Sequence, residues 1–171
     1  MLWSFMVLIT FSCYAQKKQA TAVLDQNENL VGIATKNSFL VPPFNDWFIY
    51  NYDNYTVDEA IIKQLKPLLN NITIKGFMGT WCGDSQEQIP IFYKVLDSTK
   101  FDYKNLELVT VNEAKKTPDN LQKGYNIERV PTFIFYKKGI EIGRFVESPR
   151  ESVEADMLKI VSGAPYKHSY E

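Results

Sequence analysis

Two kinds of apolar pattern alternate along the chain after residue 55, and together they predict an α/β fold. Apolar side chains spaced three and four residues apart predict amphipathic helices, whereas short continuous apolar runs predict buried strands. The predicted helices cover about 56–70, 85–98, 117–124 and 148–163, and the predicted strands cover 72–79 and 106–111.

A hairpin and a set of capping residues complete this pattern. The stretch 130–146, VPTFIFYKKGIEIGRFV, divides into a strand, a Lys-Lys-Gly turn and a second strand. Thr56 is the expected N-cap of the first helix, whereas the last helix is expected to begin at Ser148 and to end near Gly163. Pro90 predicts a kink in the second helix. The order of the elements predicts a central mixed sheet with helices on both faces.

Residues 16–55 show no clean period. They are polar at first and then rich in aromatic side chains, and Pro42-Pro43 interrupts any strand or helix there. We expect an N-terminal extension whose aromatic side chains cover the domain behind it; a surface that stacks a ligand is the alternative. The predicted organisation is this extension (16–55), one α/β domain (56–163) and a C-terminal tail (164–171).

The first residues have the pattern of an export signal. An apolar stretch from Leu2 to Phe11, too short to span a bilayer as a stable helix, is followed by small or polar residues and then by lysines. This pattern predicts a signal peptide over 1–15, cleaved after Ala15, and a periplasmic or extracellular protein. Lipidation at Cys13 is the alternative, and only that modification would give a membrane anchor.

Composition narrows the function further. The chain has 171 residues, enough for one compact domain, and its 19 basic and 20 acidic residues leave a net charge of -1. No run of lysine or arginine exceeds two, so nucleic acid is not an expected partner. His168 is the only histidine, and we expect it to be solvated in the tail, so no metal site and no cofactor are expected. Once the signal is removed, Cys82 is the single thiol and no internal disulfide can form.

One short stretch carries the candidate chemistry. Trp81-Cys82-Gly83 closes a predicted strand and opens a predicted helix, Pro90 lies eight residues after the cysteine, and Val130-Pro131-Thr132 precedes the hairpin. In these features the chain, over 57–163, resembles the thioredoxin family, which implies a thioredoxin fold. The GTWCGDS stretch is similar to exported thioredoxin-like proteins of bacteria whose motif ends in Asp-Ser.

The resemblance also implies a substrate groove. Pro131 would be a cis-proline facing Cys82, so that the backbone polar groups of Val130 can pair with an extended substrate. Trp81 would shield one side of the sulfur. The expected partners are protein or small-molecule thiols and disulfides. The residues expected to bind them are Trp81, Gly83, Asp84, Val130, Pro131 and Thr132.

The position of Cys82 has a physical meaning of its own. A cysteine at a helix N-terminus faces unpaired backbone N–H groups and the positive end of the helix dipole, so its thiolate is favoured. Cys82 is therefore the expected attacking sulfur. Asp84 acts in the opposite direction, because a nearby carboxylate disfavours a second negative charge.

Three positions depart from the family pattern. Ser85 stands where dithiol members carry the second cysteine, so it cannot release a mixed disulfide, although its hydroxyl can donate a hydrogen bond to the Cys82 thiolate. Asp84 stands where a proline is usual, and Gly76 takes the place of the family's buried acid, which helps the second cysteine to react. The residues that would release a mixed disulfide are absent, whereas the residues that would attack a disulfide remain.

Two functions are consistent with these residues. In the first, Cys82 and Ser85 form the catalytic site of a monothiol thiol–disulfide oxidoreductase, and an external thiol releases the mixed disulfide. In the second, the protein is a redox-inactive binding module that uses the groove beside Pro131. The Cys-Gly-x-Ser form also occurs in monothiol glutaredoxins that hold an iron–sulfur cluster, but Trp81 and the export signal argue against that function.

Overall fold

The computed structural model of the protein describes residues 21–171, so the predicted signal peptide and Cys13 lie outside the described residues. Among residues 21–171, no helix is both long and apolar enough to cross a bilayer. The strands and α-helices in chain order are β1 (Val23–Leu24), β2 (Leu30–Ala34), α1 (Asn45–Asn54), α2 (Glu59–Leu68), β3 (Ile72–Met78), α3 (Gly83–Thr99), β4 (Leu106–Thr110), β5 (Thr132–Lys137), β6 (Ile140–Val146) and α4 (Val153–Ser162).

The strands form one mixed sheet in the order β1-β2-β4-β3-β5-β6. Only β3 and β4 run parallel, and the other neighbouring pairs are antiparallel. Gly76 in the middle of β3 is paired with Leu108 on one side and with Phe133 on the other. The mixed sheet with flanking helices confirms the predicted fold class, and the β5–β6 hairpin lies where the sequence predicts it.

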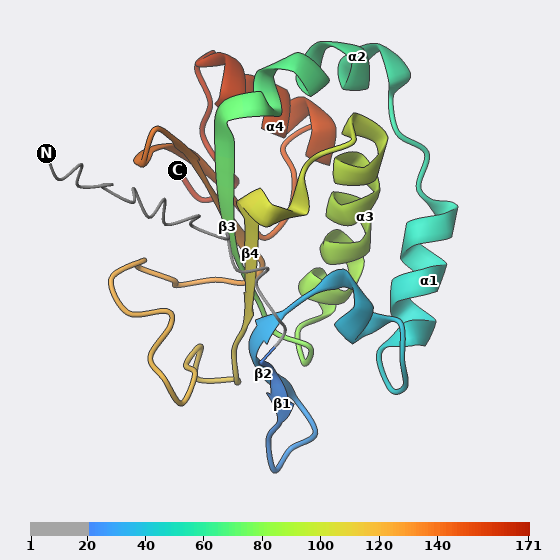
Figure 1. Ribbon diagram of the computed structural model, residues 1–171, viewed down its shortest axis with the longest axis vertical. Helices are drawn as coiled ribbons and strands as arrows, with labels where there is room; N and C mark the ends of the chain where they lie inside the picture. Colours follow the sequence, from blue (N-terminus) through green and yellow to red (C-terminus); the bar gives the residue numbers. More distant parts are fainter. Residues whose placement is uncertain (1–20) are drawn as a thin grey trace, which may run out of the picture.

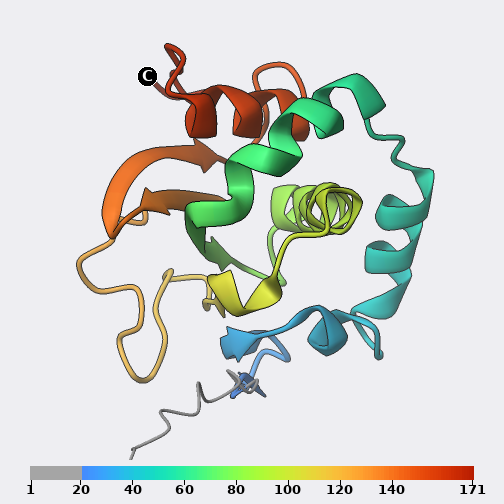
Figure 2. The same cartoon turned by 45° about the horizontal axis from the view of Figure 1, so that its top comes forward.

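Helices cover one face of this sheet, not both faces as predicted. All four α-helices of residues 21–171 contribute to one large buried cluster, on the face of β3 that carries Ile74. The opposite face carries a smaller cluster built on Phe77, Val109 and Ile134, and partly buried residues of the loop 111–130 pack against it. Figure 1 shows α1 and α3 on one side of β3 and β4 and this yellow-to-orange loop on the other side, and the turned view in Figure 2 agrees.

The predicted helix over 117–124 is absent, which explains why helices cover only one face of the sheet in residues 21–171. This segment forms turns, in which the Thr117 hydroxyl accepts a hydrogen bond from the Leu121 N–H at 2.8 Å. Asn120 and Gly124 have positive φ angles of 54° and 88°. Left-handed residues interrupt a right-handed helix, so the Asn and Gly turn signals outweigh the weak helical pattern.

Two helices begin later than predicted, because the side chain that caps each helix lies further along the sequence than the predicted cap. Asp58, and not Thr56, caps α2, and its carboxylate accepts hydrogen bonds from the N–H groups of Ala60 at 2.8 Å and Ile61 at 3.2 Å. Ser152, and not Ser148, caps α4. These side chains satisfy helix N–H groups that would otherwise lack partners.

Residues 21–55 cover the core with aromatic side chains, as predicted, but they also form β1, β2 and α1. Phe39 and Phe48 are fully buried and stack with their ring centroids 5.9 Å apart. β2 pairs antiparallel with β4, which makes this segment part of the sheet. The absence of a clean period in the sequence did not exclude regular structure here.

The close packing at Gly76 leads to a stability prediction. A Cβ there would lie 2.8 Å from Leu108 Cδ1 and 2.9 Å from the ring of Phe133, which stacks on Phe92 with centroids 3.6 Å apart. Gly76→Ala is therefore expected to lower the free energy of unfolding by about 1–3 kcal/mol, the usual cost of overpacking. Urea unfolding measures this change. Gly83→Ala is the control, because a Cβ at Gly83 meets no atom within 4 Å, and an equal loss in both variants would contradict the prediction.

Candidate active site around Cys82

Cys82 lies where the chain leaves β3 and enters α3. It is the N-cap residue of α3, with extended backbone angles, φ -93° and ψ 123°. Its N–H donates to the Gly79 carbonyl at 3.0 Å, and its carbonyl accepts from the Gln86 N–H at 3.0 Å. Cys82 is a free, half-buried cysteine, so its sulfur is held at the helix N-terminus and is partly accessible.

The sulfur contacts a second segment far away in the sequence. The Val130–Pro131 peptide bond is cis, and the Cys82 thiol donates a hydrogen bond to the Val130 carbonyl, with Sγ and O 3.2 Å apart. The Val130 N–H has no hydrogen-bond partner in residues 21–171. The backbone of Val130 therefore presents one acceptor in contact with the sulfur and one unused donor.

The side chains expected in the substrate groove differ in their exposure. Gly83 and Asp84 are exposed, and Trp81 is half-buried. Val130, Pro131 and Thr132 are buried, and the Thr132 hydroxyl donates to the Arg129 carbonyl at 2.7 Å. Val130, Pro131 and Thr132 therefore offer a partner little side-chain surface on the Pro131 side of the sulfur.

Trp81 is fixed on the other side of Cys82. Its Nε1–H donates to the Val111 carbonyl at 2.9 Å, and its ring packs so closely over Gly79 that a Cβ there would lie 2.5 Å from ring atoms. Trp81 and Cys82 both pack against the smaller buried cluster. Gly79 is thus required, because the Trp81 ring leaves no room for a Cβ at this position.

Two polar residues of the first turns of α3 are more deeply buried than the sequence suggests. Ser85 is fully buried, and its hydroxyl accepts a hydrogen bond from the Gly79 N–H at 3.3 Å instead of donating to Cys82. Ser85 lies three residues after the N-cap, so its side chain points toward the end of β3, where the Gly79 N–H requires an acceptor. Gln88 is also buried, and its Oε1 has no hydrogen-bond partner in the described part of the chain.

His168 also differs from expectation. Its side chain is 17% exposed rather than fully solvated, its Nε2 lies 3.7 Å from the Glu171 carboxylate, and its Nδ1 accepts from the Tyr170 N–H at 3.2 Å. Across residues 21–171, no three His, Cys, Asp or Glu side chains are grouped so that they can hold a metal ion.

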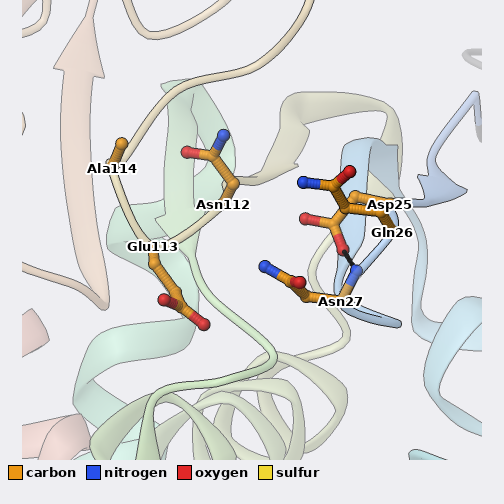
Figure 3. A pocket seen from close by; sticks show the side chains of 6 residues that line it. All are labelled: Asp25, Gln26, Asn27, Asn112, Glu113 and Ala114. Carbon is orange, nitrogen blue, oxygen red and sulfur yellow. Dashed lines mark hydrogen bonds between the residues drawn. The ribbon is translucent and has the colours of Figure 1, made fainter.

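Two hollows lie close to the residues that flank the site. The first, of about 430 Å³, adjoins Val111, whose carbonyl holds Trp81. Figure 3 shows its lining: Asp25, Gln26 and Asn27 of the β1–β2 turn face Asn112, Glu113 and Ala114, which follow β4. The second, of about 340 Å³, adjoins Pro131, and its lining includes Arg129, Thr132 and Tyr170.

The match to a known family decides the classification. A family model described as thioredoxin matches residues 47–159, well over half of the chain. The chain belongs to the thioredoxin family. Members of this family are in general thiol–disulfide oxidoreductases that act on protein thiols and disulfides.

Individual thioredoxins match the chain at moderate identity. Chloroplastic thioredoxin Y of Oryza sativa subsp. japonica is 36% identical over 88 residues, which cover 52% of this chain and 46% of the rice protein. The thioredoxin of Mus musculus is 27% identical over 101 residues, which cover 59% of this chain and 90% of the mouse protein.

Solved structures support the fold. A protein of unknown function from Pseudomonas aeruginosa superposes with a TM-score of 0.57 at 16% identity, and the match covers 76% of this chain and 92% of that protein. An HIV epitope scaffold superposes with a TM-score of 0.58 at 16% identity, covering 76% of this chain and 93% of the scaffold. At such identities the likeness concerns the fold alone.

The buried hydrogen bond of Ser85 leads to a second prediction. Ser85→Ala is expected to lower the free energy of unfolding by about 1–3 kcal/mol, because the buried Gly79 N–H loses its acceptor. Chemical denaturation measures the loss. Ser98→Ala, on the same helix, is the matched control, since the Ser98 hydroxyl makes no hydrogen bond within residues 21–171. A loss at Ser85 no larger than that at Ser98 would show that the Gly79 bond is not required.

Proposed function

We propose that the protein is a monothiol thiol–disulfide oxidoreductase in which Cys82 is the reacting residue. The observation that carries this proposal is the contact between a half-buried free thiol at the N-cap of α3 and the carbonyl of Val130, which precedes the cis-proline. No side chain caps α3, so the first N–H groups of this 17-residue helix remain available to stabilise a thiolate.

The proposed reaction is an exchange of disulfides without net electron transfer to the protein. The Cys82 thiolate attacks one sulfur of a disulfide substrate, a new S–S bond forms, and the other substrate sulfur leaves as a thiolate with the electron pair of the broken bond. An external thiolate then attacks the substrate sulfur of the mixed disulfide, and Cys82 leaves as a thiolate. One disulfide has been exchanged for another, and the protein is unchanged.

The backbone of Val130 links substrate binding to this reaction. In the free protein its carbonyl accepts the hydrogen of the Cys82 thiol. An extended substrate would supply an N–H to this carbonyl and a carbonyl to the unused Val130 N–H, as in β-strand addition. This pairing would hold the substrate disulfide beside the Cys82 sulfur. Trp81, Gly83 and Asp84 form the surface that this substrate meets.

Ser85 makes the reaction depend on an external thiol. Its hydroxyl is buried and is bonded to Gly79, and it has no sulfur with which to attack a mixed disulfide. Gly76, packed against Leu108 and Phe133, leaves no room for an acid behind the site. Both features support a protein specialised for the first half of the reaction.

We also propose that the protein acts in the periplasm or outside the cell. The support is the apolar stretch within 1–15, together with a described chain in which Cys82 is the free cysteine. Disulfides persist in such oxidising compartments, so protein or small-molecule disulfides are suitable partners there.

The second candidate is a redox-inactive binding module. The burial of Val130, Pro131 and Thr132 favours it, because a closed groove restricts the approach of a disulfide to the sulfur. The two candidates differ in the reactivity that they require of Cys82.

Reactivity of Cys82 is therefore the first functional prediction. In a Cys13→Ser background, the folded protein is expected to form one mixed disulfide per chain with oxidised glutathione at neutral pH, because the α3 N–H groups stabilise the attacking thiolate. Intact-mass spectrometry detects the adduct, and dithiothreitol removes it. Additional replacement of Cys82 by Ser is the control and should abolish the adduct. A thiol that reacts only in denaturant would favour the binding module.

Restoring a second thiol tests the monothiol mechanism. Ser85→Cys is expected to release glutathione from the mixed disulfide at least about tenfold faster than Ser85→Ala in the absence of added thiol, because an adjacent thiol attacks Cys82 intramolecularly. Chromatography of the released glutathione measures the rate. Equal rates in the two variants would mean that the missing cysteine does not limit release.

A further inference from the structure

The C-terminal tail brings an aromatic residue to the Pro131 side of the site. The Tyr166 hydroxyl donates to the Asp156 carboxylate at 3.1 Å, and the Ser169 hydroxyl donates to the Ser148 carbonyl at 2.7 Å. These bonds hold the tail against the domain. The ring of Tyr170 then lies against the guanidinium of Arg129, whose central carbon is 3.8 Å from the ring centroid.

Arg129 lies two residues before Pro131. Its side chain is held in place, although not all of its N–H donors have partners in residues 21–171. Its side chain is 46% exposed, and Nη1 lies 3.4 and 3.5 Å from the two carboxylate oxygens of Glu147, which is long for an ion pair. Nε and Nη2 have no hydrogen-bond partner in residues 21–171. Stacking on Tyr170 covers one face of the planar group and leaves its edge open to a ligand.

Two other charged groups at the same hollow, Arg144 and Glu171, are already engaged. Arg144 donates to both carboxylate oxygens of Glu141, at 2.8 and 2.9 Å, and the Glu171 carboxylate accepts from the His168 N–H at 3.2 Å. Glu128 also lines the hollow. Within the described chain, Arg129 is therefore the cation at this hollow that has the largest number of unused donors.

The Arg129 site is also close to the reacting end of α3. The Tyr170 hydroxyl donates to the Glu147 carboxylate, and this hydrogen bond raises the pKa of Tyr170. The charge of Asp84 adds a smaller effect in the same direction. Arg129 itself directly precedes Val130, whose carbonyl oxygen lies 3.2 Å from the Cys82 sulfur.

We propose that Arg129, held by Tyr170, is a specificity-determining residue that binds a carboxylate of the disulfide substrate near the sulfur that Cys82 attacks. A carboxylate accepts two parallel hydrogen bonds from the open edge of a guanidinium. Glu128, which lines the same hollow, and Glu147, which lies beside Arg129, repel an acidic group that is not seated on the guanidinium, and so they restrict the preference to this one position. The inference rests on the proposed function and adds the class of substrate, a disulfide with an acidic neighbour.

The test compares two peptide disulfides that differ only in Glu or Gln beside the cysteine. Rates of mixed-disulfide formation with Cys82 are measured for the full chain carrying Cys13→Ser. The Glu peptide is expected to react about two- to fivefold faster, the range of an exposed charge pair. Arg129→Gln should reduce this ratio to about one or below, and Tyr170→Ala should reduce it in part. Lys123→Gln is the matched control, because it removes an exposed cation from the same loop and should leave the ratio unchanged.

Because both rates are measured on one preparation of each variant, their ratio does not depend on the protein concentration. A ratio of one in the unsubstituted protein would overturn the inference while leaving the proposed function intact. An equal loss in Lys123→Gln would also overturn it, because the preference would then reflect overall charge. If neither peptide forms a mixed disulfide, the proposed function itself fails.

Discussion

Without the antiparallel pairing of β3 with β5, the two segments that form the site would not meet. The register sets Phe77 near the end of β3 opposite Thr132 at the start of β5. The residues that follow β3 and those that precede β5 therefore emerge at the same edge of the sheet. This is why the Cys82 sulfur reaches the carbonyl of Val130 across 48 positions of sequence. A slip of one residue would turn every side chain of the strand to the wrong face, so the buried clusters fix the register.

Packing on the helical face explains why no acidic side chain stands at Gly76. Phe133 stacks on Phe92 of α3, and together with Leu108 it fills the space above Gly76. A carboxylate at Gly76 would have to displace this apolar packing and would be buried without a partner, which is costly. Aromatic side chains thus fill the space where dithiol members of the family carry an ionisable group. Ser85, at the position of their second cysteine, is consistent with this packing.

The elements that were predicted correctly are those marked by a pattern within their own residues. β3, α3 and the β5–β6 hairpin follow apolar runs, a helical period and a turn, and the Cys-Gly pair and Pro131 lie beside them as expected. β2 was not predicted, because its five residues include Gly32 and its stability comes from pairing with β4 far along the chain. The burial of Ser85 and the stacking of Tyr170 on Arg129 depend on tertiary contacts that leave no periodic trace in the sequence.

The loop 111–130 has a consequence for how such a protein can diversify. Its first residue, Val111, holds the Trp81 indole, and its last residue, Val130, contacts the sulfur through its carbonyl. One continuous stretch, on the face without helices, thus supports Trp81 on one side of the sulfur and contacts the sulfur on the other side. Replacing this stretch by that of a relative would therefore change the support of Trp81 and the backbone beside the sulfur together, while Trp81, Pro131 and the helices would remain those of the recipient.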